Sequence, residues 1–178
     1  MKTPLLYQLS EFDCGPITLY NALKYLFDRD EISYEVIKEI MNITLDKKEK
    51  GTSKEAMKKS SLSLKKYLPL NVLIYEGNAV TPEIIRENND PKTVFILRTK
   101  LCCEHYVLIT KMDDIFAYIF DPYYLEEDYY TTDNDVAIVL HETFSHNRLV
   151  KIERLFDEDK KDFSLLEKDK RSIIVLKR

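Results

Sequence analysis

Residues 8–16 read Gln-Leu-Ser-Glu-Phe-Asp-Cys-Gly-Pro, and the interpretation of the whole chain starts from them. Cys14 stands directly before Gly15 and Pro16, and proline is favoured in the first turn of a helix. The apolar residues that follow recur at helical spacing: Leu19, Tyr20, Leu23, Leu26 and Phe27. The pattern predicts a helix from Cys14 to about Asp28, with a thiol at its first position.

The position of Cys14 at a helix start favours a reactive thiol. Free N–H groups and the positive end of the helix dipole favour a thiolate over a thiol at a helix start. A thiolate attacks carbonyl carbon, and Gly15 has no side chain to crowd the approaching substrate. The alternative interpretation is a small core residue, because free cysteine is among the most buried residue types. A nearby base would distinguish a nucleophilic Cys14 from a cysteine that only fills the core.

His105 and Asp121 are the candidates for that base and for the group that orients it. His105 heads the apolar run 106–109, and the next apolar run ends at Asp121. Residues 112–114, Met-Asp-Asp, suit a three-residue hairpin loop, which would place His105 directly opposite Asp121 on one face of the sheet. Directly opposed residues have Cβ atoms about 4.5–5.5 Å apart, so the carboxylate would orient the imidazole. Alternatively, Asp121 and Pro122 form only a strand-ending turn.

Gln8 completes the set, six residues before Cys14. Its amide and the backbone N–H of Cys14 can donate hydrogen bonds to an oxyanion, although a surface glutamine is the alternative interpretation. Cys14 as nucleophile, His105 as proton carrier and Asp121 as its orienting partner then predict acyl-transfer chemistry.

The remaining pattern places helices first and strands afterwards. Further helices are expected over Ser33–Met41, after Gly51, where Thr52 and Glu55 have capping-box spacing, and at Thr81-Pro82. Strands are expected in β-branched and aromatic runs at 72–75, 93–97, 106–109, 115–120 and 173–176. The lysine-rich residues 47–50 predict a solvated loop, and residues 123–167 give no clear assignment. This order is typical of an α+β domain with a mostly antiparallel sheet.

Length and composition bound the class of protein. A chain of 178 residues that is 44% hydrophobic can bury a substantial core, so one domain is expected and disorder is excluded. A net charge of −4 gives no reason to expect nucleic acid or an anionic membrane as the partner. No window resembles a membrane span or a signal peptide, so a cytoplasmic location with three free thiols is expected.

Three weaker sequence features have structural interpretations that involve no chemistry. Cys102, Cys103 and His105 do not make a metal cluster, because no second Cys-x-x-Cys pair supplies the remaining zinc ligands, and both cysteines are expected to pack. Cys103 has the strand parity of His105 and points to the same side. His141 and His146 are expected to be surface or sheet residues. Four tyrosines either rim a peptide cleft or cover the sheet: Tyr123, Tyr124, Tyr129 and Tyr130.

These residues resemble the bacteriocin-processing peptidase domain, a family of papain-like cysteine peptidases. The resemblance rests on Gln8, on Cys14-Gly15-Pro16, on the run His105-Tyr106-Val107-Leu108 and on Asp121-Pro122, and it covers about residues 5–125, including the helix start at 51–53. It implies that residues 1–178 form one papain-like domain, with a helical lobe packed on an antiparallel sheet and the site between them. It also implies Cys14 as nucleophile, His105 as general base, Asp121 as its orienting partner and Gln8 as oxyanion donor, without a metal or organic cofactor.

The family's best-known members place this domain ahead of a membrane transporter and cut a leader peptide after two small residues, usually glycines. This sequence has no transmembrane region and no Gly-x-x-x-x-Gly-Lys motif, so a transporter partner would be a separate chain. The leading hypothesis is a peptidase that acts on a peptide or protein through a Cys14 thioester. An acyltransferase, in which an amine resolves the thioester, and a catalytically silent peptide-binding module are the alternatives. The complete set of four residues argues against the silent module.

Overall fold

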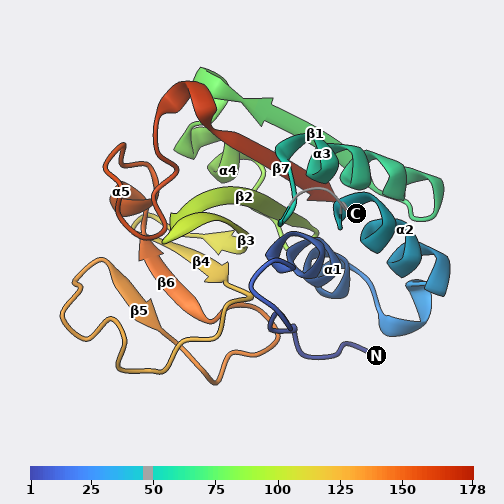
Figure 1. Cartoon of the computed structure of the whole chain (residues 1–178), viewed down its shortest axis with the longest axis horizontal. Helices are drawn as coiled ribbons and strands as arrows, with labels where there is room; N and C mark the ends of the chain where they lie inside the picture. The colour runs from blue at the N-terminus through green and yellow to red at the C-terminus, as the bar shows by residue number, and fades with distance from the viewer. Residues whose placement is uncertain (46–49) are drawn as a thin grey trace.

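The computed structural model describes residues 1–45 and 50–178, and within them seven strands form one antiparallel sheet (Figure 1). The spatial order of the strands is β1-β7-β2-β3-β4-β6-β5. Their bounds are β1 Asn71–Glu76, β2 Thr93–Leu101, β3 Cys103–Met112, β4 Phe116–Phe120, β5 Val136–Ile138, β6 Arg148–Lys151 and β7 Ser172–Lys177. The helices are α1 Cys14–Leu26, α2 Tyr34–Thr44, α3 Lys54–Ser63, α4 Pro82–Glu87 and α5 Ile152–Leu155. The expected α+β class is confirmed, and β5 and β6 fall in the segment that had no assignment.

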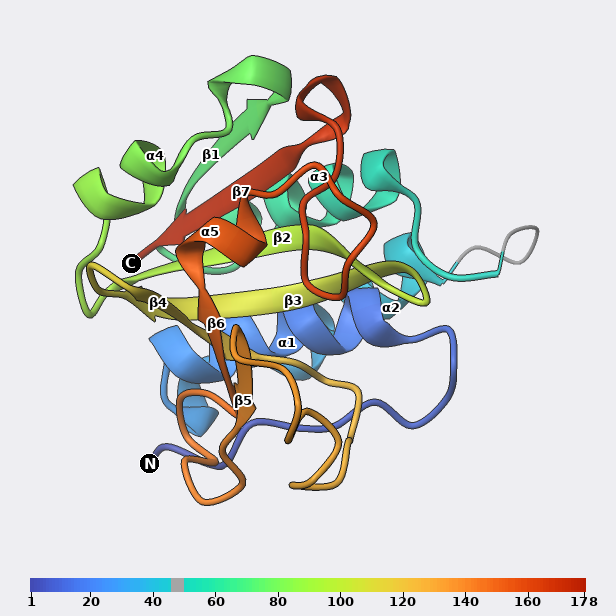
Figure 2. The same ribbon diagram turned by 90° about the vertical axis from the view of Figure 1, so that its left-hand side faces the viewer.

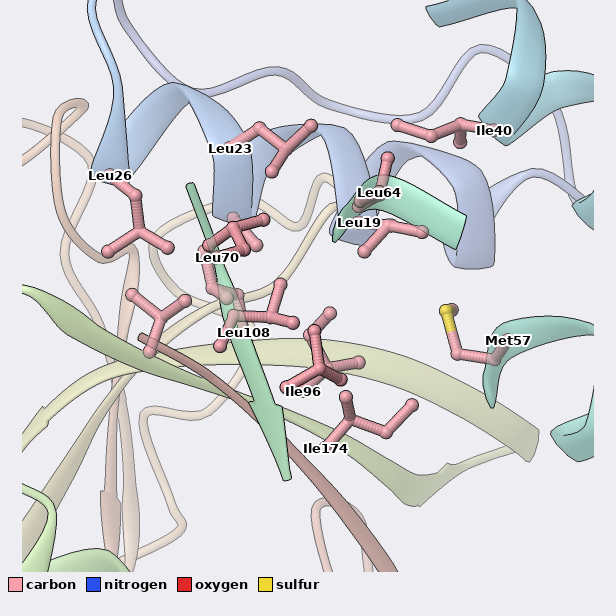
Figure 3. Close-up of a cluster of buried hydrophobic side chains, with 14 of the residues drawn as sticks. Leu19, Leu23, Leu26, Ile40, Met57, Leu64, Leu70, Ile96, Leu108 and Ile174 are labelled. Carbon is pink, nitrogen blue, oxygen red and sulfur yellow. The ribbon is translucent and has the colours of Figure 1, made fainter. Parts of the chain in front are cut away.

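Helices α1, α2 and α3 cover one face of the sheet, and α5 lies against the other (Figure 2). On the helical side, Leu19 and Leu23 of α1 pack on Ile96, Leu108 and Ile174 of the central strands (Figure 3). The alternate residues of the same strands form a second core with α5: Phe95, Val107, Ile109, Ile119 and Val175. Central strands that are buried on both faces explain why their sequence reads as continuous apolar runs.

The start of α3 differs from the expected capping box. Ser53 caps the helix, because its hydroxyl accepts a hydrogen bond from the backbone N–H of Ala56 at 3.1 Å. Thr52 instead donates to the carbonyl of Thr44 at 3.0 Å. The loop expected over 47–50 lies, apart from Lys50, outside the described residues. None of the described helices is long and apolar enough to cross a membrane.

Gly15 is explained by this contact between the two helix starts. A Cβ built at Gly15 would lie 2.3 Å from Thr52 Oγ1 and 2.5 Å from Thr52 Cβ, well inside contact distance. The glycine therefore lets α1 pack against Thr52, whereas the sequence suggested that it clears a path for substrate.

We expect Gly15→Ala to lower the free energy of unfolding by about 1–3 kcal/mol, because overpacking forces backbone shifts. Urea denaturation measures the change. In a Thr52→Gly background the same substitution should cost almost nothing, since the clashing atoms are gone. An unchanged midpoint for Gly15→Ala in the otherwise native chain would contradict this account.

Candidate active site

The hairpin of β3 and β4 brings His105 to Asp121 in a register that differs from the expected one. The pair that closes the loop is Met112 with Ala117, which leaves four residues between them where three were expected. Asp113 fixes this longer loop, since its carboxylate accepts two backbone N–H groups at 2.8 and 2.7 Å. The predicted direct cross-strand pairing of His105 with Asp121 is therefore wrong.

A β-bulge at Thr110 compensates for the longer loop. The register shifts by one residue between Ile109 and Lys111, so Thr110 is the extra residue of β3. Side chains alternate between faces, and the extra loop residue alone would turn His105 and Asp121 to opposite sides of the sheet. The bulge adds a second offset of one residue and returns them to the same side. They meet as diagonal neighbours.

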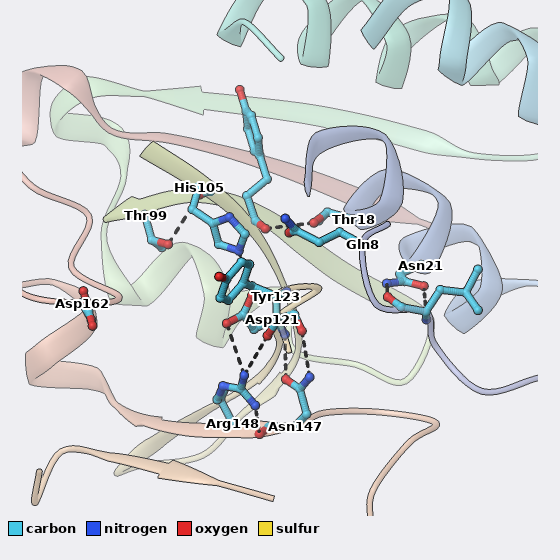
Figure 4. Close-up of polar contacts among 12 residues, drawn as sticks. Gln8, Thr18, Asn21, Thr99, His105, Asp121, Tyr123, Asn147, Arg148 and Asp162 are labelled. Carbon is cyan, nitrogen blue, oxygen red and sulfur yellow. Dashed lines mark hydrogen bonds and ion pairs between the residues drawn. The ribbon is translucent and has the colours of Figure 1, made fainter. Parts of the chain in front are cut away.

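Asp121 contacts the imidazole with one oxygen and an arginine with the other (Figure 4). Its Oδ1 lies 2.7 Å from His105 Nε2 and accepts the backbone N–H of Tyr123 at 2.8 Å. Its Oδ2 lies 3.5 Å from Arg148 Nη2, and both of these side chains are fully buried. An ionised carboxylate only accepts hydrogen bonds, so Nε2 carries the proton and Nδ1 is the ring nitrogen left for a thiol.

This environment raises the pKa of His105 above its ordinary value of 6.5. Burial by itself lowers the pKa, because desolvation disfavours the imidazolium ion, but the hydrogen bond to Asp121 and the side chain of Cys14 together outweigh that effect. The imidazolium form is favoured as a result. This is the form that pairs with a thiolate and can donate a proton to a leaving nitrogen.

Cys14 and His105 line one cavity of about 280 Å³. Cys14 is the first residue of α1, and Thr18, one turn later, donates from its hydroxyl to the carbonyl of Tyr106 at 2.9 Å. This bond ties the helix that carries the thiol to the strand residue beside His105. Cys14 is 8% exposed and His105 is 5% exposed, so both residues are largely buried at the wall of this cavity.

Gln8 lies at a second cavity, of about 200 Å³, which also contains His105. Its backbone N–H donates to the carbonyl of Pro122 at 2.8 Å, which holds it next to Asp121. Its Nε2 donates to the carbonyl of Ser10 at 2.6 Å, while Oε1 is buried and has no hydrogen-bond partner among the described residues. The carboxamide has two N–H donors, and the second remains for a substrate oxygen.

The two neighbouring cysteines are placed differently from the expectation. Cys102 and Cys103 are both exposed, so the prediction that they pack in the core is wrong. Cys102 lies in the turn between β2 and β3, and its backbone adopts the left-handed conformation with φ of 55°. It is therefore not part of either strand, and its side chain is exposed. Cys103 lines both cavities, on the side of His105 that its strand parity predicted.

Some tyrosines of the tyrosine-rich segment line the cleft and others pack in the core. Tyr123 and Tyr129 line the second cavity, and the Tyr123 ring stands edge-on to the His105 ring. Tyr130 is buried and donates to Asp162 at 2.9 Å, so it belongs to the core. Of the other histidines, His141 is exposed and His146 is half-buried against Tyr118, as a surface or sheet position predicts.

Asn147 and Arg148 support Asp121 and were missed from the sequence. The Asn147 amide accepts from the backbone N–H of Asp121 and donates to its carbonyl, both at 2.7 Å. Arg148 also donates to the carbonyls of Asn147 and Tyr123 at 2.8 and 2.9 Å. The only signal was a polar pair before the apolar Leu149-Val150, which does not distinguish a buried arginine from an exposed one.

We expect Arg148→Met to lower the free energy of unfolding by about 3–5 kcal/mol, because it leaves the buried Oδ2 atom of Asp121 without the cation beside it. Urea denaturation is the measurement. Arg86→Met removes an exposed ion pair with Glu83 and serves as the matched control, which should leave the midpoint in place. A loss for Arg148→Met no larger than that of the control would show that Asp121 does not depend on this arginine.

Comparison with known proteins places this geometry in a recognised fold. No protein-family model matches the chain, and no curated protein matches it in sequence. A double glycine motif protease from an AMS/PCAT transporter, solved in complex with the leader peptide, is similar in structure. Its TM-score is 0.54 at 16% identity, over 99% of this chain and 91% of that one. The peptidase domain of Streptococcus ComA, a bifunctional ABC transporter involved in quorum sensing, has a TM-score of 0.56 at 15% identity, over 98% and 97% of the two chains.

The chain has the fold of these peptidase domains. The expected papain-like architecture, a helical lobe on an antiparallel sheet, is thereby confirmed. At 15–16% identity the likeness concerns the fold, and the activity has to be argued from the side chains.

Proposed function

We propose that the chain is a cysteine peptidase that cleaves a peptide bond through a thioester on Cys14. The observation that carries the proposal is the buried pair of His105 Nε2 and Asp121 Oδ1, 2.7 Å apart, because His105 lines the same cavity as Cys14. A histidine with one nitrogen fixed by a carboxylate and the other left for a nucleophile is the arrangement that acyl transfer requires.

In the proposed reaction the Cys14 thiolate attacks the scissile carbonyl carbon and forms a C–S bond. The carbonyl oxygen becomes an oxyanion, with the backbone N–H of Cys14 and the Gln8 amide as its donors. The C–N bond then breaks, and the His105 imidazolium gives its proton to the leaving nitrogen. Water next attacks the thioester while His105 takes one of its protons; the C–S bond breaks, the acid leaves, and the Cys14 thiolate and the His105 imidazolium are restored.

The proposed substrate is a peptide or protein with a small residue before the scissile bond. The similarity to a double glycine motif protease supports this choice. Leader-peptide processing, with a transporter as partner, is the corresponding biological role.

An acyltransferase is the second candidate, because the same thioester can be resolved by an amine. Cleavage of a set of peptides that contain a Gly-Gly step, and separately the transfer of an acyl donor to an amine, distinguish the two activities. Cys14→Ala is the control for both. Product from neither reaction, and no covalent adduct at Cys14 by mass spectrometry, would leave a silent peptide-binding module as the better description.

Alkylation provides an independent test of the nucleophile. With iodoacetamide near pH 6, we expect Cys14 to react before Cys102 and Cys103, although those two are exposed and Cys14 is buried. The reason is that a helix start and an imidazolium partner favour the reactive thiolate. Mass spectrometry assigns the sites, and His105→Ala should slow Cys14 markedly. Alkylation of Cys14 at a rate indifferent to His105 would remove it as the nucleophile.

A further inference from the structure

The cleft consists of two cavities that meet at His105. Glu11, Cys103 and His105 line both of them. The cavity that contains Cys14 is bordered by charged side chains, among them Arg98 and Glu104. The second cavity contains Gln8 and is different in character.

Most of the second cavity is apolar. Two segments supply its wall, the turn between β2 and β3 and the chain after β4: Leu101, Cys102, Cys103, Tyr123, Leu125 and Tyr129. Gln8, Glu11 and His105 are the polar residues that line it. We call this cavity the apolar recess. A cavity of roughly 150 Å³ accommodates benzene, so about 200 Å³ is enough for an aromatic or branched aliphatic side chain.

The chemistry of the proposed function decides which half of a substrate lies there. The acyl carbon stays bonded to Cys14 Sγ and therefore remains in the cavity that Cys14 lines. The leaving nitrogen takes its proton from His105, so the amine half of the substrate lies past the imidazole. The apolar recess is the cavity on that side.

We infer that the apolar recess binds an apolar side chain of the peptide that leaves, directly after the scissile bond. The inference rests on the proposed function and adds a substrate class to it, a small residue before the bond and a large apolar one after it. A hydrophobic pocket discriminates by roughly 10-fold or more between side chains that fill it and those that do not. The same preference applies to an amine that resolves the thioester, because it enters by the route that the leaving amine takes.

Amine capture tests the preference directly. The enzyme is acylated with an activated ester of a peptide that ends in Gly-Gly, and equal concentrations of the amides of Phe, Leu, Gly and Asp are added. The amine nitrogen bonds to the acyl carbon and the C–S bond breaks, while the amine proton passes through His105 to the departing sulfur. We expect capture by Phe and Leu amides to exceed capture by Gly and Asp amides at least roughly 10-fold. Equal capture would overturn the inference.

Protection of Cys103 gives a readout that needs no turnover. In the Cys14→Ala protein, Phe amide should slow iodoacetamide modification of Cys103, which lines the recess, and Gly amide should not. Tyr129→Glu should abolish this protection, and its exposed side chain makes the variant compatible with folding. Tyr34→Glu, at an exposed site on α2, is the matched control that should retain it.

The two experiments separate failure of the inference from failure of the proposed function. Selective protection of Cys103 without any acyl-enzyme would mean that the recess binds apolar groups and that the peptidase proposal is wrong. An acyl-enzyme that shows neither selective capture nor protection would mean that the chain is an acyl-transfer enzyme and that the recess has no such role.

Discussion

Replacing Asp121 with asparagine should reduce turnover roughly 10⁴-fold. The cause is that the amide cannot satisfy His105 and Arg148 together (Figure 4). If its oxygen faces His105 Nε2, its NH₂ group faces the guanidinium, donor against donor. If the amide is reversed, the NH₂ group faces Nε2 and forces the proton onto Nδ1, the tautomer that cannot accept a proton from the thiol.

Two measurements check this prediction, kcat/KM for peptide cleavage and an NMR titration of His105. The carboxylate raises the pKa of His105, so Asp121→Asn should move the imidazole titration to lower pH. The stability that the pair contributes is fully present below the unfolded pKa of 6.5 and is lost as pH rises through the raised folded value. The variant should lack this loss on the alkaline side.

Asp162→Asn is the matched control, because this carboxylate bonds Tyr130 in the second core and not His105. Activity of Asp121→Asn within 10-fold of the native protein would show that Asp121 does not set the tautomer of His105.

The contact between His105 and Asp121 was predicted from the sequence for a reason that is only half correct. The run of apolar residues located both strands, and strand parity located the face. The loop contains one residue more than expected, and the bulge at Thr110 cancels the resulting change of face. The sequence Ile109-Thr110-Lys111 contains no signal for a β-bulge. The position of the bulge depends on how β3 pairs with the neighbouring strand.

The contact of Arg148 with Asp121 could not be predicted from the sequence, for a different reason. β6 has four residues and begins with Arg148, so it lacks the long apolar run that identifies β2 and β3. A buried arginine is recognised only when its partners are known, and these come from residues about 25 positions away in sequence. The same reasoning applies to Cys102, whose exposure follows from a left-handed turn that strand propensity does not reveal.

Gln8→Ala should reduce turnover roughly 10²–10³-fold, the usual effect of losing one oxyanion donor. The loop that carries Gln8 should keep its conformation, because it is fixed mainly by other bonds. Asp13 accepts the backbone N–H groups of Leu9 and Ser10 at 3.0 and 2.8 Å, and the backbone of Gln8 remains bonded to Pro122. The lost side-chain bond to Ser10 is exposed.

Alkylation of Cys14 distinguishes an oxyanion role for Gln8 from a structural one. Iodoacetamide reacts by displacement at a saturated carbon and develops no oxyanion, so Gln8→Ala should alkylate at the native rate while its peptide turnover falls. A parallel fall in both rates would mean that Gln8 positions the helix start and not the substrate oxygen. Turnover that stays native would make Gln8 a bystander, and the backbone N–H of Cys14 would then be the donor that remains from the proposed pair.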